Sequence, residues 1–206
     1  MSFTVPTIEW AGLAPVLIIL GAGVLGVLFE AFVPRGGRLP VQAGLSVLAI
    51  LGSGVVFVLR WAQVLPQDPR TGQVSPSGRV LAAGISEDPF AVAAQGIMLV
   101  IGLLAVLVMA DLTTAGDGAF AAQAADRPGS AEETESLHHG WTATEVFPLM
   151  LFSLAGMMLF PMVSNFITLF VVLELISLPL YIMAATARHR RLLSQESALK
   201  YFVLGA

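Results

Sequence analysis

The stretch FVVLELISLPLYIMAA, residues 170–185, decides the fold class of this chain. It is almost wholly apolar, and it lies inside a longer apolar run at about 165–187. A helix needs about 20 mostly apolar residues to cross a bilayer, so this run predicts a spanning helix. Glu174 lies within it, and a carboxylate in such a helix calls for a functional explanation.

The composition supports a membrane protein. Of the 206 residues, 56% are hydrophobic and 12% are charged, with a mean hydropathy of +0.84. Soluble domains are about 25% charged, so these values indicate an integral membrane protein. A net charge of −4 offers no basic surface for nucleic acid. The absence of cysteine excludes disulfides, thiolate metal sites and cysteine nucleophiles.

Five apolar runs, the one above included, predict an all-α polytopic membrane protein. The predicted spanning segments are residues 12–33, 40–62, 89–113, 144–162 and 165–187. A sixth helix begins at 194 and reaches 206 after about 12 residues, which is too short to cross a bilayer. We therefore expect the chain to be a fragment of a longer protein. Residues 114–143, rich in Ala, Gly and acidic residues, are predicted to form a flexible acidic loop.

Basic residues predict the orientation. The segments PRGGR (34–38) and RHRR (188–191) fall on the same side if every predicted segment spans. Short basic loops face the cytoplasm, which places the N-terminus outside. Three arginines near the opposite loop, Arg60, Arg70 and Arg79, oppose this assignment.

Glu174 is the first candidate site residue. It lies about nine residues into its helix, roughly 13 Å deep, where an ionised side chain costs about 2.5 kcal/mol or more. Ser177 and Tyr181, at i+3 and i+7, share its helix face. Pro179 cannot donate to the carbonyl of Leu175, which leaves an acceptor nearby. This polar stripe predicts a hydrated proton path; the alternative is a protonated Glu174 that hydrogen-bonds a neighbouring helix as packing glue.

Lys200 is the second candidate. It lies in the sixth helix, and Glu196 precedes it by four residues, the favourable order for a helical ion pair. A buried lysine can carry protons when its distance to a carboxylate changes. The residues alone leave both interpretations open, proton carrier and local ion pair.

Other charged residues have simpler explanations. Glu30 and Asp111 lie near helix ends, where acidic residues are ordinary. Glu145 begins the fourth segment and suits the positive end of its helix dipole. His138 and His139 are adjacent in the predicted loop, a poor arrangement for a metal. We expect no metal site, and no phosphate loop or catalytic triad is present.

Three motifs resemble one family closely. They are EVFPLMLFSLAGMM (145–158), FVVLELISLPLY (170–181) and ESALKYFVLGA (196–206), with a looser match at LAPVLIILGAGVLGVLFEAF (13–32). They resemble subunit N of the bacterial proton-pumping NADH:quinone oxidoreductase, respiratory complex I, an antiporter-like subunit family. The resemblance covers most of residues 1–206 and is strongest over the last 60 or so.

The resemblance implies a fold of about fourteen transmembrane helices with two inverted repeats, each holding a broken helix. By motif match, Glu174 corresponds to the fifth-helix glutamate that modulates a pump lysine in that family. Lys200 corresponds to the lysine of its KYF motif. The pump lysines on later helices would lie beyond residue 206. The long acidic loop at 114–143 departs from the family pattern.

The resemblance also implies partners. NADH, flavin, iron–sulfur clusters and quinone are expected in other subunits, and no cofactor in this chain. Neighbouring antiporter-like and small bundle subunits of the membrane arm are the expected partners, in the bacterial cytoplasmic membrane.

Two other functions remain open. An Mrp-type sodium/proton antiporter subunit shares the ancestry, and sodium-dependent transport would identify it. A non-pumping structural membrane subunit would tolerate loss of Glu174 or Lys200 without a change in proton flux.

Overall fold

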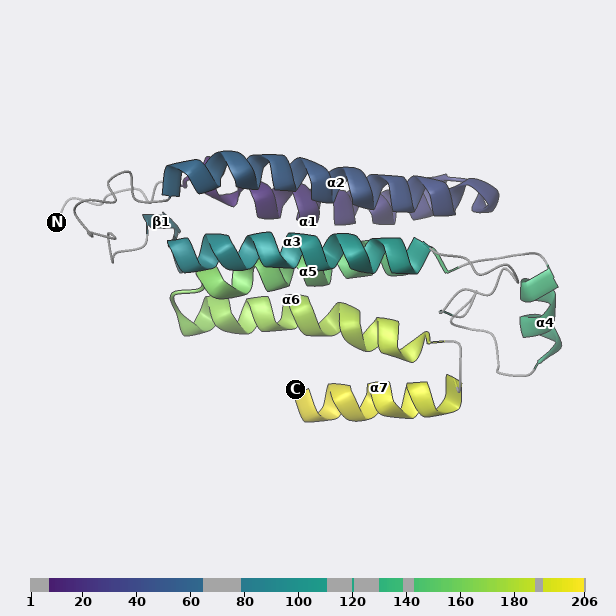
Figure 1. The fold of residues 1–206 in the computed structure, drawn as a ribbon. Coiled ribbons are helices and arrows are strands. Elements are labelled where there is room, and N and C mark those ends of the chain that lie inside the picture. The colour runs from purple at the N-terminus through teal and green to yellow at the C-terminus, as the bar shows by residue number, and fades with distance from the viewer. Residues whose placement is uncertain are drawn as a thin grey trace.

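The computed structural model describes residues 8–64, 79–110, 120, 130–138, 143–187 and 191–205. Its long helices lie side by side along one direction (Figure 1). The helices are α1 (Trp10–Phe32), α2 (Arg35–Val64), α3 (Pro89–Ala110), α4 (Ala131–His138), α5 (Val146–Leu159), the short 3-10 helix η1 (Phe160–Met162), α6 (Phe166–Ala185) and α7 (Arg191–Gly205). The predicted fold class is confirmed: the chain is an all-α polytopic membrane protein with one small hairpin.

Among the described residues, four helices, α1, α2, α3 and α6, are long and apolar enough to cross a membrane. The fourth predicted segment is shorter, because α5 and η1 together run only from Val146 to Met162. Pro161 lies in η1 and has no N–H to continue the α-helical ladder, which explains the change of helix type after Leu159.

Helix α2 begins five residues before the predicted start at residue 40. Pro40 lies inside it, near the beginning, where it removes only one backbone hydrogen bond. The 30 residues of α2 extend over about 45 Å, which exceeds a hydrocarbon core of about 30 Å. The earlier start brings Arg38 onto the helix, one turn before Gln42.

Helix α5 is the centre of the bundle. Ten of its 14 residues are buried, and it packs against α1, α3 and α6. The core around it combines apolar side chains from every long helix except α6 and α7: Val16, Ile19, Ile50, Leu99, Val106, Phe147, Leu151 and Leu154. By contrast, α6 has buried residues only at Val172 and Pro179.

A two-stranded hairpin closes one end of the bundle (Figure 1). Strands β1 (Arg79–Ala82) and β2 (Ile85–Glu87) lie within the predicted outer loop, and the sequence analysis missed them. Leu81 is fully buried, and its carbonyl accepts a bond from the Glu9 N–H at 2.8 Å. Gly84, at φ 83°, supplies the left-handed turn and accepts from the Ser164 N–H at 2.9 Å. The hairpin therefore ties the start of α1 to the α5–α6 turn.

The segment predicted as a flexible loop contains a helix, α4. Ser130 precedes α4, and its carbonyl accepts from the Thr134 N–H at 3.2 Å and from the Thr134 hydroxyl at 3.1 Å. Acidic residues follow in the first turn, where they favour the helix dipole. The prediction of a loop was therefore wrong for residues 131–138; residues 114–119, 121–129 and 139–142 lie outside the described residues.

Helices α5 and α6 approach closely at Gly156. A Cβ added there would lie 2.7 Å from Cγ1 of Ile176, 3.0 Å from its backbone N and 3.2 Å from the carbonyl carbon of Leu175. Only glycine allows this approach, which is a common device between membrane helices. The contact involves Leu175 and Ile176, the two residues that follow Glu174 in the sequence.

Candidate functional site

Glu174 lies near the middle of α6, about 12 Å from Phe166 along the axis. Its side chain is half-buried, and within the described part of the chain it has no hydrogen-bond or ion-pair partner. The structure therefore places the carboxylate where the sequence predicted, in the central part of an apolar helix. Its role in proton transfer stays a prediction.

The predicted polar stripe faces away from α5. With about 100° between successive residues, Glu174, Ser177 and Tyr181 lie on the side opposite the buried pair Val172 and Pro179. The Ser177 hydroxyl donates to the Leu173 carbonyl at 2.7 Å, along the helix itself. The three predicted residues therefore share one face, but Ser177 uses its proton locally.

Helix α7 covers the Tyr181 end of this stripe. The Tyr181 ring packs edge-on against Tyr201, with centroids 4.6 Å apart, and against Phe202 at 5.6 Å. Figure 1 shows α7 running back along α6 from the end of that helix. The neighbours of Glu174 on α6, Leu173 and Leu178, remain 42% and 46% exposed. One half of the stripe is thus covered and the other is open in the described chain.

A hydrogen bond from α5 reaches the backbone of α6 next to Pro179. The Ser153 hydroxyl donates to the carbonyl of Ile176 at 3.2 Å. The sequence analysis expected an available acceptor at Leu175, one residue earlier. The bond lies on the α5 side of α6. It therefore anchors α6 to α5 and adds no polar group to the helix face that carries Glu174.

The structure does not bring Lys200 to Glu174. The ammonium lies 2.5 Å from a carboxylate oxygen of Glu196, and the two side chains are 68% and 56% exposed. This is the local ion pair that the sequence analysis left open. A role for Lys200 in proton transfer stays a prediction.

An exposed pair of this kind contributes little to stability. Replacing Lys200 by glutamine in the 206-residue chain should lower the free energy of unfolding by less than about 1 kcal/mol, because water screens the charges and both side chains lose entropy on pairing. Urea unfolding in detergent micelles measures it. A larger loss would show that Lys200 has a buried partner in the folded protein.

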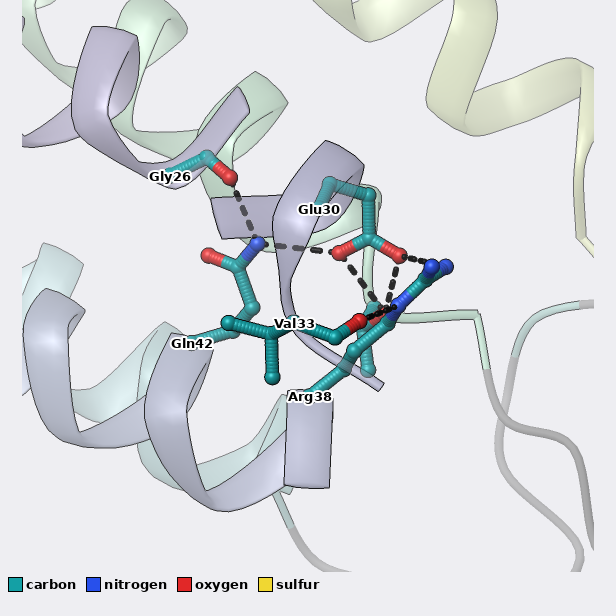
Figure 2. A network of polar contacts seen from close by, with 6 residues as sticks. Gly26, Glu30, Val33, Arg38 and Gln42 are labelled. Carbon is teal, nitrogen blue, oxygen red and sulfur yellow. Dashed lines mark hydrogen bonds and ion pairs between the residues drawn. The ribbon is translucent and has the colours of Figure 1, made fainter. Parts of the chain in front are cut away.

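A polar network that was not predicted from the sequence surrounds Glu30 (Figure 2). Arg38 donates from Nη1 to Oε1 of Glu30 at 2.9 Å, and Gln42 donates from Nε2 to Oε2 at 2.9 Å. The Thr144 hydroxyl lies 2.7 and 2.9 Å from the two carboxylate oxygens. Gln42 also donates to the Gly26 carbonyl at 2.8 Å. One carboxylate therefore joins α1, α2 and Thr144, which lies two residues before the start of α5.

This network is well enclosed. Gln42 and Thr144 are 1% and 3% exposed, and the side chains of Arg38 and Glu30 are 24% and 15% exposed. Arg38 further donates from Nε to the Val33 carbonyl at 2.8 Å, which holds the α1–α2 turn. The one available sequence signal was the i, i+4 spacing of Arg38 and Gln42, which the late predicted start of α2 concealed.

A second buried ion pair lies at the hairpin end. Arg60 of α2 donates from Nη2 to Oε2 of Glu87 in β2, and the two side chains are 8% and 3% exposed. From the sequence, Arg60 was assigned only to the vicinity of a loop. Asp88 alone acts as the cap, since its Oδ1 accepts from the Ala91 N–H at 2.6 Å.

The remaining candidates do not form a site. Glu145 is exposed and makes no capping hydrogen bond with its side chain. Asp111, His139 and the side chain of His138 lie outside the described residues. No cluster of three or more His, Cys, Asp or Glu residues that could hold a metal occurs among the residues described.

Comparison with known proteins gives named relatives. No family model matches the chain. It is 47% identical over 210 residues to NADH-quinone oxidoreductase subunit N of Beutenbergia cavernae, a match that covers 100% of this chain and 39% of that protein. It is 46% identical over 215 residues to subunit N of Mycobacteroides abscessus, with 98% and 37% covered.

A third relative is NADH-quinone oxidoreductase subunit N 3 of Streptomyces griseus, 43% identical over 211 residues, with 100% of this chain and 37% of that protein covered. The chain thus spans well under half the length of the relatives it matches. The matches extend over the whole chain, including the helices that carry Glu30 and Glu174. The chain therefore belongs to the family of NADH-quinone oxidoreductase subunit N.

Proposed function

We propose that the chain is part of a proton-translocating membrane-arm subunit of NADH:quinone oxidoreductase. The observation that carries this proposal is the carboxylate of Glu174. It lies half-buried in the middle of an apolar spanning helix and has no partner among the described residues. Ionisable groups at such depth usually serve ion or proton pathways, because their burial in lipid is costly.

The proposed mechanism is electrostatic. Glu174 changes its distance to a lysine of the same membrane arm, and the lysine takes up or releases a proton as its negative neighbour approaches or withdraws. Tyr181 and Ser177 line the same face and hold water beside the carboxylate. Lys200 serves as a proton carrier once it leaves Glu196. Quinone reduction elsewhere in the complex supplies the driving energy.

The proposal also includes the cofactors, the partner subunits and the membrane that surround the chain. NADH, flavin, iron–sulfur clusters and quinone are held by other subunits, and this chain holds no cofactor or metal and carries out no redox step. Its partners are neighbouring antiporter-like and small bundle subunits and the lipid bilayer. The membrane is the bacterial cytoplasmic membrane, with the N-terminus outside. In support, the α1–α2 turn and the end of α6 lie at the same end of the bundle (Figure 1).

The test is Glu174→Gln in the full-length subunit within the assembled enzyme. Glutamine keeps the size and loses the charge. An opposite charge within about 4 to 6 Å favours the charged form of a lysine, so loss of the Glu174 charge should change proton loading about tenfold or more. The protons pumped per NADH oxidised in reconstituted vesicles should fall, while the amount of assembled complex stays the same.

Glu132→Gln on α4 is the matched control, because Glu132 is exposed and lies outside the bundle. It should leave the ratio unchanged. Full pumping by Glu174→Gln would overturn the proposal. Transport that depends on sodium would identify an Mrp-like antiporter.

A further inference from the structure

In the Glu30 network, one hydrogen-bond acceptor group is matched with donor side chains. A carboxylate only accepts hydrogen bonds, and its three side-chain partners, Arg38, Gln42 and Thr144, all present donors. The network thus satisfies a fixed negative charge. Such an arrangement suits an anchor that keeps one geometry, in contrast to Glu174, which has no partner among the described residues.

The network holds one end of α5. The Thr144 carbonyl accepts from the Phe147 N–H at 3.2 Å, which ties Thr144 to the second residue of that helix. Its hydroxyl reaches Glu30, which lies 114 positions earlier in the sequence. The contact therefore fixes the start of α5 against the α1–α2 pair.

The other half of α5 touches α6 next to Glu174. Gly156 lies against the backbone of Leu175 and Ile176, and Ser153 bonds the Ile176 carbonyl. These are the first two residues after Glu174. Two of the three atoms nearest to Gly156 belong to the α6 backbone, so an axial shift of α5 moves this part of α6.

Membrane helices need polar contacts to fix their axial positions. Lipid tails are as apolar as leucine, so apolar helix faces have little hydrophobic reason to keep one position along the bundle axis. Directional hydrogen bonds do distinguish positions, since their strength falls steeply with distance and angle.

We propose that Glu30, with Arg38, Gln42 and Thr144, fixes the axial position of α5 and thereby the depth of Glu174 in the membrane. Glu30 and Thr144 are positioning residues for proton transfer, acting through α5. This inference rests on the proposed function for its effect on pumping, and on the geometry alone for its effect on the position of α6.

The first readout is position. None of the 206 residues is cysteine. Leu178→Cys, one turn after Glu174, therefore adds a thiol to this part of the chain, and its reaction with a water-soluble maleimide in the full-length subunit of the assembled enzyme is read from the peptide that contains residue 178. Thr144→Val removes the hydroxyl and keeps the shape. The labelling rate should change about threefold or more, and Thr144→Ser, which keeps the hydroxyl, should restore it. A cysteine at Val108→Cys on α3, 74% exposed, should react unchanged.

The second readout is coupling. Thr144→Val and Glu30→Gln should lower the protons pumped per NADH about threefold while NADH oxidation continues, and Thr144→Ser should pump normally. If the Glu30→Gln enzyme fails to assemble, the comparison of Thr144→Val with Thr144→Ser still tests the inference. Unchanged labelling in Thr144→Val overturns the inference, whatever the pumping. Full pumping in Glu174→Gln with altered labelling in Thr144→Val rejects the proposed function and supports the anchor.

Discussion

Replacement of Glu87 by alanine should destabilise the protein by about 3 to 5 kcal/mol, because it removes the carboxylate that the buried guanidinium of Arg60 contacts. The two side chains are 8% and 3% exposed, so water cannot replace the lost partner. The pair also joins α2 to the hairpin, whose Leu81 closes the end of the bundle. Unfolding of the full-length subunit by denaturant in detergent micelles measures the change.

Two further variants distinguish the effect of burying an ion pair from the effect of losing a charge. Glu196→Ala removes the partner of an exposed lysine and should cost less than about 1 kcal/mol. The double change Arg60→Met with Glu87→Leu replaces both charges by apolar groups and should recover most of the stability, because no charge then remains buried. Equal losses in Glu87→Ala and Glu196→Ala would contradict the burial of the Arg60 pair.

Replacement of Gly156 by alanine should destabilise the α5–α6 pair by about 1 to 3 kcal/mol, the usual cost of overpacking. The added Cβ would meet the backbone N of Ile176 at 3.0 Å and the carbonyl carbon of Leu175 at 3.2 Å. Backbone atoms cannot rotate away, so the two helices must separate. The effect is measured by heating solubilised membranes and quantifying the subunit that remains soluble at each temperature.

The matched control is Gly21→Ala. Gly21 lies on α1, and a Cβ there has no neighbour within 4 Å. Alanine also favours helix relative to glycine, so this variant should be as stable as the unmodified protein or more so. Equal stability of the two variants would show that α5 and α6 do not approach closely at Gly156.

Much of the fold could be predicted because lipid imposes a strong local rule. A chain in hydrocarbon must satisfy its own backbone, so each long apolar run specifies a helix with little help from distant residues. The hairpin follows no such rule. Its position depends on Leu81 entering the bundle and on Ser164 donating to Gly84, contacts between residues far apart in the sequence.

Glu174 and the Glu30 network also differ in how far each could be predicted from the local sequence. Glu174 could be identified because a carboxylate stands out inside an apolar run. Glu30 sits near a helix end, where acidic residues are common, and its importance depends on Thr144, which is 114 positions away. The start of α2 added to the difficulty, because Pro40 resembled a helix beginning and hid the helical spacing of Arg38 and Gln42.

The enclosure of α5 has a consequence for biogenesis. This helix has 14 residues and packs against α1 and α3, which are synthesised before it, and against α6, which follows. A chain emerges from the ribosome with its N-terminal part first. We therefore expect α5 to remain beside the insertion machinery until α6 has been synthesised, and to enter the lipid together with it.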